Sequence, residues 1–76
     1  MEKTTFYVMY WNDRADYPAA VFEVQAEGEL EAEEIARNNG GEDYEDDWPL
    51  LTKTDLTENE IVRYKNSVYT DYYIIN

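Results

Sequence analysis

The stretch that decides the fold is TTFYVMYW, residues 4–11. It is rich in aromatic and β-branched side chains and has the length of one β-strand. Successive side chains of a strand point to opposite faces of its sheet. The two faces would carry, respectively, Phe6, Val8 and Tyr10, and Thr5, Tyr7, Met9 and Trp11. Because both faces carry large side chains, we expect this strand to be central in a sheet or covered on both sides.

A second strand is predicted over residues 19–26, AAVFEVQA. The segment between the two strands, residues 12–18, contains Asn and Asp, which bond their own backbone in turns, and Pro18, which cannot donate to a strand ladder. The simplest pairing is therefore a long hairpin. The side chains expected in the core are Phe6, Val8, Phe22, Val24, Tyr72 and Ile74.

Residues 29–38 predict a short helix that follows Gly28. Glutamates crowd its first turns, where the helix dipole favours carboxylates. Residues 39–41, Asn-Gly-Gly, would end it, because glycine adopts the left-handed conformation without penalty. Its narrow apolar stripe would consist of Leu30, Ala32, Ile35 and Ala36.

A second helix is predicted over residues 58–66 by a capping box. Thr57 would be the N-cap, with Glu60 three residues later reaching back to it. Leu56 and Ile61 are placed to form the hydrophobic staple that often accompanies such a box. A helix this short must dock against the rest of the chain to persist.

The remaining apolar segments are residues 50–53, a short strand or an extended connection, and residues 68–75, a last strand. The predicted order is β-β-α-(β)-α-β. The sequence therefore predicts one domain over residues 1–76, of the α+β class. It would contain an antiparallel sheet of three strands, or four if residues 50–53 pair, and two short helices.

The composition excludes several kinds of site. The 76 residues include no cysteine and no histidine, which removes thiolate metal sites, disulfides and the commonest general base. We therefore expect no enzyme and no cofactor. No apolar run approaches the roughly 20 residues of a membrane span, and the N-terminus lacks a signal-peptide pattern, so we expect a cytoplasmic protein. The net charge of −12 argues against direct binding of nucleic acid or anionic membranes.

The acids are concentrated in residues 27–47, which hold ten acids against one base, Arg37, and so supply −9 of the net charge of −12. Carboxylates in residues 42–47 could offer oxygen ligands to calcium or magnesium. Their spacing does not match the EF-hand pattern, and we predict no dedicated metal site. Weak binding of divalent cations stays open.

A protein partner is the interpretation that uses the whole stretch. Clustered acids steer a chain toward a basic surface, and tyrosine and tryptophan are favoured interface anchors. The candidate partner-binding residues are Glu29, Glu33, Glu34, Glu42, Asp43, Tyr44, Glu45, Asp46, Asp47 and Trp48. The alternative is that the helical glutamates form only a solvated face, while Tyr44 and Trp48 cap the core.

In size, acidity, lack of cysteine, abundance of tyrosine and the run EDYEDD at residues 42–47, the chain resembles the small phage-encoded inhibitors of host defence, of the anti-CRISPR and anti-restriction type. This resemblance implies a protein that binds a basic, nucleic-acid-handling partner, such as a CRISPR or restriction nuclease, in the host cytoplasm. Its acidic surface would occlude the partner's nucleic-acid site. The alternative is a small structural or assembly protein that self-associates, as a homodimer, through aromatic strand faces.

Overall fold

The two predicted N-terminal strands form the centre of the sheet in the computed structural model, which describes residues 2–75. β1 (Thr4–Tyr10) and β2 (Ala20–Ala26) pair antiparallel along their whole length. The register places Val8 opposite Phe22, so large apolar side chains meet across the pair. The predicted hairpin and the central position of the first strand are confirmed.

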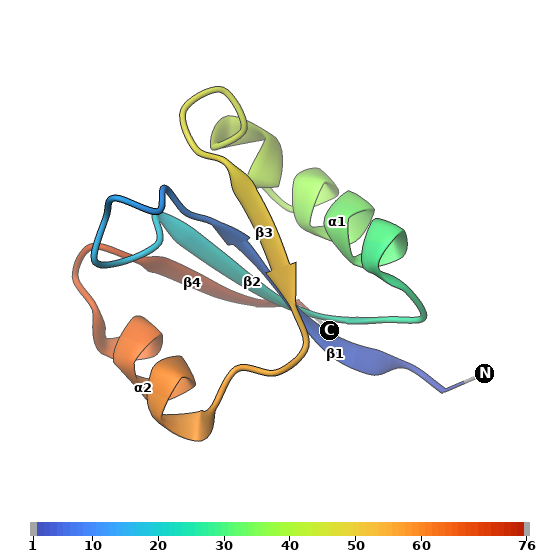
Figure 1. The fold of residues 1–76 in the computed structure, drawn as a ribbon. Helices are drawn as coiled ribbons and strands as arrows, with labels where there is room; N and C mark the ends of the chain where they lie inside the picture. Colours follow the sequence, from blue (N-terminus) through green and yellow to red (C-terminus); the bar gives the residue numbers. More distant parts are fainter. Residues whose placement is uncertain (1, 76) are drawn as a thin grey trace.

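Two further strands complete the sheet in the order β3-β1-β2-β4 (Figure 1). β3 (Leu50–Lys53) pairs antiparallel with β1, so this segment is a strand and not merely a connection. β4 (Asp71–Ile75) pairs with β2 in parallel. The α+β class is confirmed, but the sheet is mixed and not purely antiparallel. The physical reason is that a helical crossover brings the chain back to the end of the sheet where the preceding strand began. The strand after the helix therefore runs parallel to the strand before it.

The two helices lie on opposite faces of the sheet (Figure 1). α1 (Glu29–Asn38) connects β2 to the edge strand β3. α2 (Glu58–Asn66) connects β3 to β4, the strand at the other edge of the sheet. These two crossovers run in opposite directions across the sheet. Crossovers between parallel strands share one hand almost without exception, and two crossovers of one hand that run in opposite directions place their helices on opposite faces.

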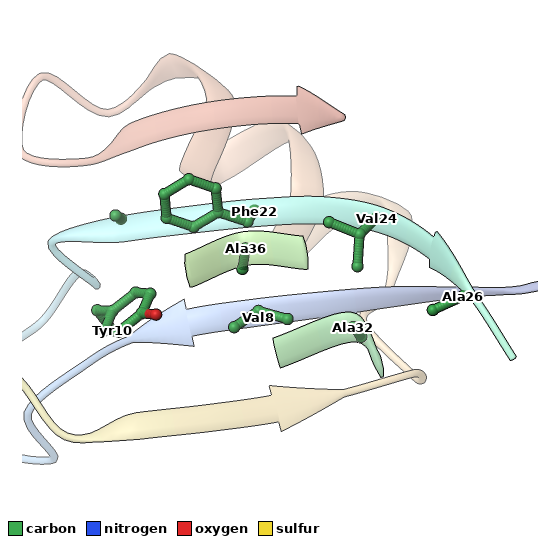
Figure 2. Close-up of a cluster of buried hydrophobic side chains, with 8 residues drawn as sticks. Val8, Tyr10, Phe22, Val24, Ala26, Ala32 and Ala36 are labelled. Atoms are coloured by element: carbon green, nitrogen blue, oxygen red, sulfur yellow. The ribbon is translucent and has the colours of Figure 1, made fainter. Parts of the chain in front are cut away.

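The face under α1 holds the larger core (Figure 2). Helix residues Ala32 and Ala36 lie over the strand side chains, and their small size lets the helix approach the sheet closely. Tyr10 and Phe22 meet edge to face with ring centroids 5.9 Å apart. The buried members of this core are Val8, Tyr10, Ala20, Phe22, Val24, Ala26, Ala32 and Ala36.

The face under α2 holds a smaller core with an aromatic border. Its buried members are Met9, Val21 and Tyr64. Tyr64 is the one buried residue of α2, and its ring meets Trp11 edge to face at 5.6 Å. The partly buried border consists of Tyr7, Trp11, Tyr17, Leu56 and Tyr72.

The predicted core is correct for the central strands and wrong at Ile74, and Leu30 of the predicted apolar stripe of α1 is exposed. Val8, Phe22 and Val24 are buried, and Phe6 and Tyr72 are partly buried. Ile74, however, is 53% exposed, because it lies on an edge strand whose outer face the nine-residue α2 does not cover. Leu30 is 82% exposed, because it lies on the outward side of α1, away from Ala32 and Ala36.

The last strand begins later than predicted, at Asp71 instead of Val68. The amide of Asp71 donates to the carbonyl of Ala19 at 3.0 Å, and this bond starts the pairing with β2. The hydroxyl of Thr70 donates to the carbonyl of Pro18 at 2.8 Å. Val68 and Tyr69 therefore precede the sheet and are exposed.

The predicted capping box of α2 is confirmed. The Thr57 hydroxyl oxygen accepts from the Glu60 amide at 3.2 Å, and the Glu60 carboxylate accepts from the Thr57 amide at 3.1 Å. Bonds from the backbone and then the hydroxyl of Thr57 lower the pKa of Glu60. A lowered folded-state pKa contributes stability above the unfolded pKa, and that stability is lost as the pH falls through the folded pKa.

We predict that Thr57→Ala lowers the free energy of unfolding by about 1 kcal/mol at pH 7, because the first turn of α2 loses its cap. The deficit should narrow as the pH falls through the lowered pKa of Glu60, because its carboxylate then becomes protonated. Urea unfolding followed by circular dichroism measures both effects. Thr54→Ala, at an exposed position in the preceding turn, is the control and should change stability little. Equal losses in the two variants would contradict the capping role.

Candidate protein-binding surface

The acidic stretch lies on one side of the sheet (Figure 1). It begins just before α1, continues through the short 3-10 helix η1 (Gly41–Asp43), and ends in the turn before Trp48. Gly40 makes the bend between α1 and η1 with φ of 114°, a left-handed conformation that suits glycine. The helix on the opposite side is balanced, since α2 carries Glu58, Glu60, Arg63 and Lys65. The sheet therefore lies between the acidic helix α1 and the balanced helix α2.

The three predicted acids of α1 differ in their surroundings. Glu29 and Glu34 are exposed, whereas Glu33 is half-buried because its Oε2 accepts a hydrogen bond from Thr52 Oγ1 of β3 at 2.9 Å. A shallow hollow of about 370 Å³ lies on the outer side of the helix. It is lined by Leu30, Glu33, Glu34, Arg37 and Asn38. The helix therefore presents one exposed leucine among its carboxylates.

Glu45 joins the acidic loop to the helix. The Arg37 Nε donates to Glu45 Oε1 at 2.7 Å, and this bond raises the pKa of Arg37. Such an exposed pair adds little to global stability, but it fixes where the loop lies relative to α1. Because it already has a cationic partner, Glu45 contributes less free charge than the sequence indicates.

Tyr44 caps the core under α1, as the alternative interpretation of the sequence proposed. Its ring is half-buried, with centroids 5.7 Å from Tyr10 and 6.3 Å from Phe22. Its hydroxyl donates to Asp71 Oδ2 at 2.7 Å and lies 3.3 Å from the Tyr73 hydroxyl. Burial, followed by these bonds, raises the pKa of Tyr44 well above its usual value. The side chain therefore anchors the loop to β4.

The remaining acids of the loop face solvent. Glu42, Asp43, Asp46 and Asp47 are exposed. In the described part of the chain, Arg37 with Glu45 is the one ion pair, so these four carboxylates keep their charge available. Within residues 2–75, no group of three carboxylates is arranged to hold a metal ion.

A cleft of about 480 Å³ opens where β1 ends and the other three strands begin. Its wall consists of Ala15, Asp16, Tyr17, Ala19, Trp48 and Tyr69. Trp48 also packs against the core under α1, and Tyr17 against the core under α2. The cleft therefore lies at the end of the sheet, between the two layers.

Three chain segments are fixed around this cleft by hydrogen bonds. The Trp11 amide donates to the Pro49 carbonyl at 2.8 Å and so ties the β1–β2 loop to the turn before β3. The bonds of Pro18 with Thr70 and of Ala19 with Asp71 tie the same loop to the segment before β4. Asp16 and Tyr69 lie 53 positions apart in the sequence, and the parallel pairing of β4 with β2 brings them together, so no local sequence pattern marks them as site residues.

Comparisons of the chain with protein-family models, with curated proteins and with solved structures found no match. No helix within residues 2–75 combines the length and the apolar character needed to cross a membrane. The function must therefore be argued from the charge, the exposed surface and the contacts of this chain. Its two distinctive surface features are the acidic layer over α1 and the aromatic cleft beside it.

We predict that Gly41→Ala destabilises the fold by about 1–3 kcal/mol, the usual cost of overpacking. An added Cβ would lie 2.5 Å from the Tyr10 hydroxyl and 2.8 Å from the Ala36 carbonyl oxygen. Urea unfolding measures the loss. Gly28→Ser is the control, because a Cβ there has no atom within 4 Å and serine is favoured at an N-cap.

A second variant tests whether the Tyr10 contact causes the loss. The Tyr10 hydroxyl is buried and has no hydrogen-bond partner within residues 2–75, so Tyr10→Phe alone should cost little. Combined with Gly41→Ala, it should recover part of the lost stability. Additive losses in the double variant would mean that the two positions do not interact.

Proposed function

We propose that the chain is a non-enzymatic binding protein that inhibits or modulates a basic, nucleic-acid-handling protein. A CRISPR or restriction nuclease is the kind of partner that fits, and the acidic surface would occlude its nucleic-acid site. The observation that carries this proposal is the separation of charge by the sheet: the stretch with net charge −9 lies on the α1 side, opposite the balanced α2. A field concentrated on one face steers association with a basic surface.

The density of charge along α1 supports the proposal. Its ten residues rise about 15 Å in total and include Glu29, Glu31, Glu33 and Glu34. This is about one carboxylate every 4 Å, close to the roughly 3.4 Å per phosphate along one DNA strand. A groove built for a single strand would meet a similar density of charge on this helix, with the loop acids extending the surface beyond its C-terminal end.

The negative charge of the chain also favours a basic protein as the partner over nucleic acid or a membrane. Nucleic acid and anionic membranes are both negatively charged and would be repelled by this surface. A basic protein would be attracted to it. The proposed place of action is the cytoplasm, where a nuclease partner meets its target.

We predict that the double variant Asp46→Lys/Asp47→Lys weakens partner binding by about 30-fold, because two contacts of roughly 1 kcal/mol each are lost. Both positions are exposed, and the variant leaves the Arg37–Glu45 pair intact. Immobilised chain first captures partners from a bacterial lysate across a salt gradient, with identification by mass spectrometry. Affinity for a purified captured protein is then measured, together with competition by DNA.

The matched control is Glu2→Lys/Asp55→Lys, which changes the net charge by the same amount at two exposed positions outside the acidic stretch. It should bind almost as the parent chain does. Equal weakening by both double variants would indicate general ion exchange, as would elution at trivial salt. A captured protein that binds DNA and this chain simultaneously would contradict occlusion.

A second candidate function, self-association, is favoured by the outer edge of β4. Its sequence, DYYII, contains neither the lysine nor the proline that commonly protect edge strands. Tyr73 and Ile74 on this strand are 39% and 53% exposed. The opposite edge, β3, ends in Lys53 and follows Pro49, so it is better protected. An unprotected edge can pair with the same edge of a second copy.

If this second candidate is correct, we expect a dimer in size-exclusion chromatography with light scattering. Ile74→Lys should convert it to a monomer, because a lysine on an edge strand disfavours pairing with another edge. Val62→Lys is the control, since Val62 is half-exposed on α2 and is not part of that strand. A parent chain that stays monomeric at the highest concentration tested would exclude this function.

A further inference from the structure

We propose that the aromatic cleft at the end of the sheet receives a cationic side chain, arginine or lysine, from the basic partner. This inference rests on the proposed function and names the contact that would fix the partner's position. The cleft lies immediately after the exposed acids of the loop, because Trp48 in its wall follows Asp47 in the chain. A partner drawn to those acids would therefore bring its basic side chains to the cleft.

The wall of the cleft has the composition of a cation-binding site. Three of its six residues, Tyr17, Trp48 and Tyr69, are aromatic, and its one charged residue is Asp16. The rings of Tyr17 and Tyr69 lie with centroids 5.8 Å apart and planes tilted by 34°. Aromatic faces carry negative potential and attract ammonium and guanidinium groups. A carboxylate beside such rings adds a charge that selects a cation over a neutral group.

A contact within the chain shows that one of these rings already accepts a guanidinium. The Arg63 Cζ lies over the Tyr17 ring, 4.9 Å from its centroid. This is within the roughly 6 Å range of a cation–π interaction. Arg63 comes from α2 and is not part of the cleft wall. Tyr17 therefore already holds one guanidinium, and its residue also lines the cleft, so an incoming cation would bind beside Arg63.

The cleft is fixed in place before any partner arrives. The backbone bond from Trp11 to Pro49 and the bonds made by Pro18 and Ala19 hold its three segments together. Pro18, which is part of the β1–β2 loop, is fully buried. A site held in this way loses little conformational freedom on binding. A volume of about 480 Å³ admits a side chain, while the partner's backbone would stay outside.

The first experiment uses the free chain without any partner. Labelled protein is titrated with N-acetyl-argininamide and, separately, with N-acetyl-citrullinamide, which has nearly the same shape but no charge. With the arginine probe, NMR should show saturable shifts of the Trp48 indole N–H and of the amides of residues 15–19 and 69, in the millimolar range typical of a single side chain. The citrulline probe should bind at least fivefold more weakly.

Four variants identify the groups that bind the probe. Asp16→Asn and Tyr69→Leu should each weaken the arginine probe about fivefold. Both residues are exposed, so the fold should tolerate their replacement. Tyr69→Phe keeps the ring and should bind as the parent does. Asp13→Asn removes the same charge from the same loop outside the cleft, and it should have little effect.

Three results would overturn the inference. These are equal binding of the two probes, equal weakening by Asp13→Asn and Asp16→Asn, or shifts that avoid the cleft. Failure of the probe together with a partner that still responds to Asp46→Lys/Asp47→Lys would reject the cleft and leave the proposed function standing. Specific binding of the arginine probe without any retained partner would support the cleft as a cation site and reject the proposed function.

Discussion

The structure depends on one constraint, which is that the central strand β1 must be covered on both faces. Val8 and Met9 are neighbours in the sequence, point to opposite faces, and are both fully buried. Burying each apolar side chain of this size contributes roughly 1.5–3 kcal/mol, so neither face can be left to solvent in so small a domain. Two α-helices lie within residues 2–75, and each covers one face. The reversed direction of the two crossovers follows, and it places the acidic α1 and the balanced α2 on opposite faces of the sheet.

The two faces solve the packing problem in different ways. α1 approaches the sheet through Ala32 and Ala36, which leaves most of its circumference free for carboxylates. The core beyond its C-terminal end is closed by Tyr44 and Trp48 of the acidic loop. The loop is therefore structural on its inner side and charged on its outer side. α2 instead inserts one large ring, Tyr64, and relies on a border of partly buried aromatics.

Local patterns in the sequence were enough to predict the local elements. Alternation predicted the hairpin of β1 and β2, and the residues around Thr57 predicted α2 with its cap. The direction of β4 was wrong because its partner β2 lies about 50 positions earlier, and no short-range signal specifies such a pairing. Ile74 was wrong for a related reason, since alternation assigns a side chain to a face but does not say how far a helix covers that face.

The candidate site was predictable only in part. The acids and Trp48 could be identified from composition, while the attachment of Tyr44 to Asp71 and of Arg37 to Glu45 required the folded arrangement. Those attachments show that Tyr44 and Glu45 fix the position of the loop, whereas the other acids of the loop are exposed. The cleft was missed because its wall comes from three separate segments. Such convergence at the end of a sheet is a property of topology, and a single sequence does not display it.

The bond between Tyr44 and Asp71 spans 27 positions and links the acidic loop to the edge strand β4. Segments with few buried contacts are among the first parts of a fold to open in local unfolding, and β4 is an edge strand with exposed side chains. When β4 leaves the sheet, the loop loses its anchor at Asp71 and the cleft loses the support of the segment that carries Tyr69. The amides of β4 and of the loop should therefore exchange with solvent together. The acidic loop and the edge strand then share one opening equilibrium, and a contact that stabilises either one orders both.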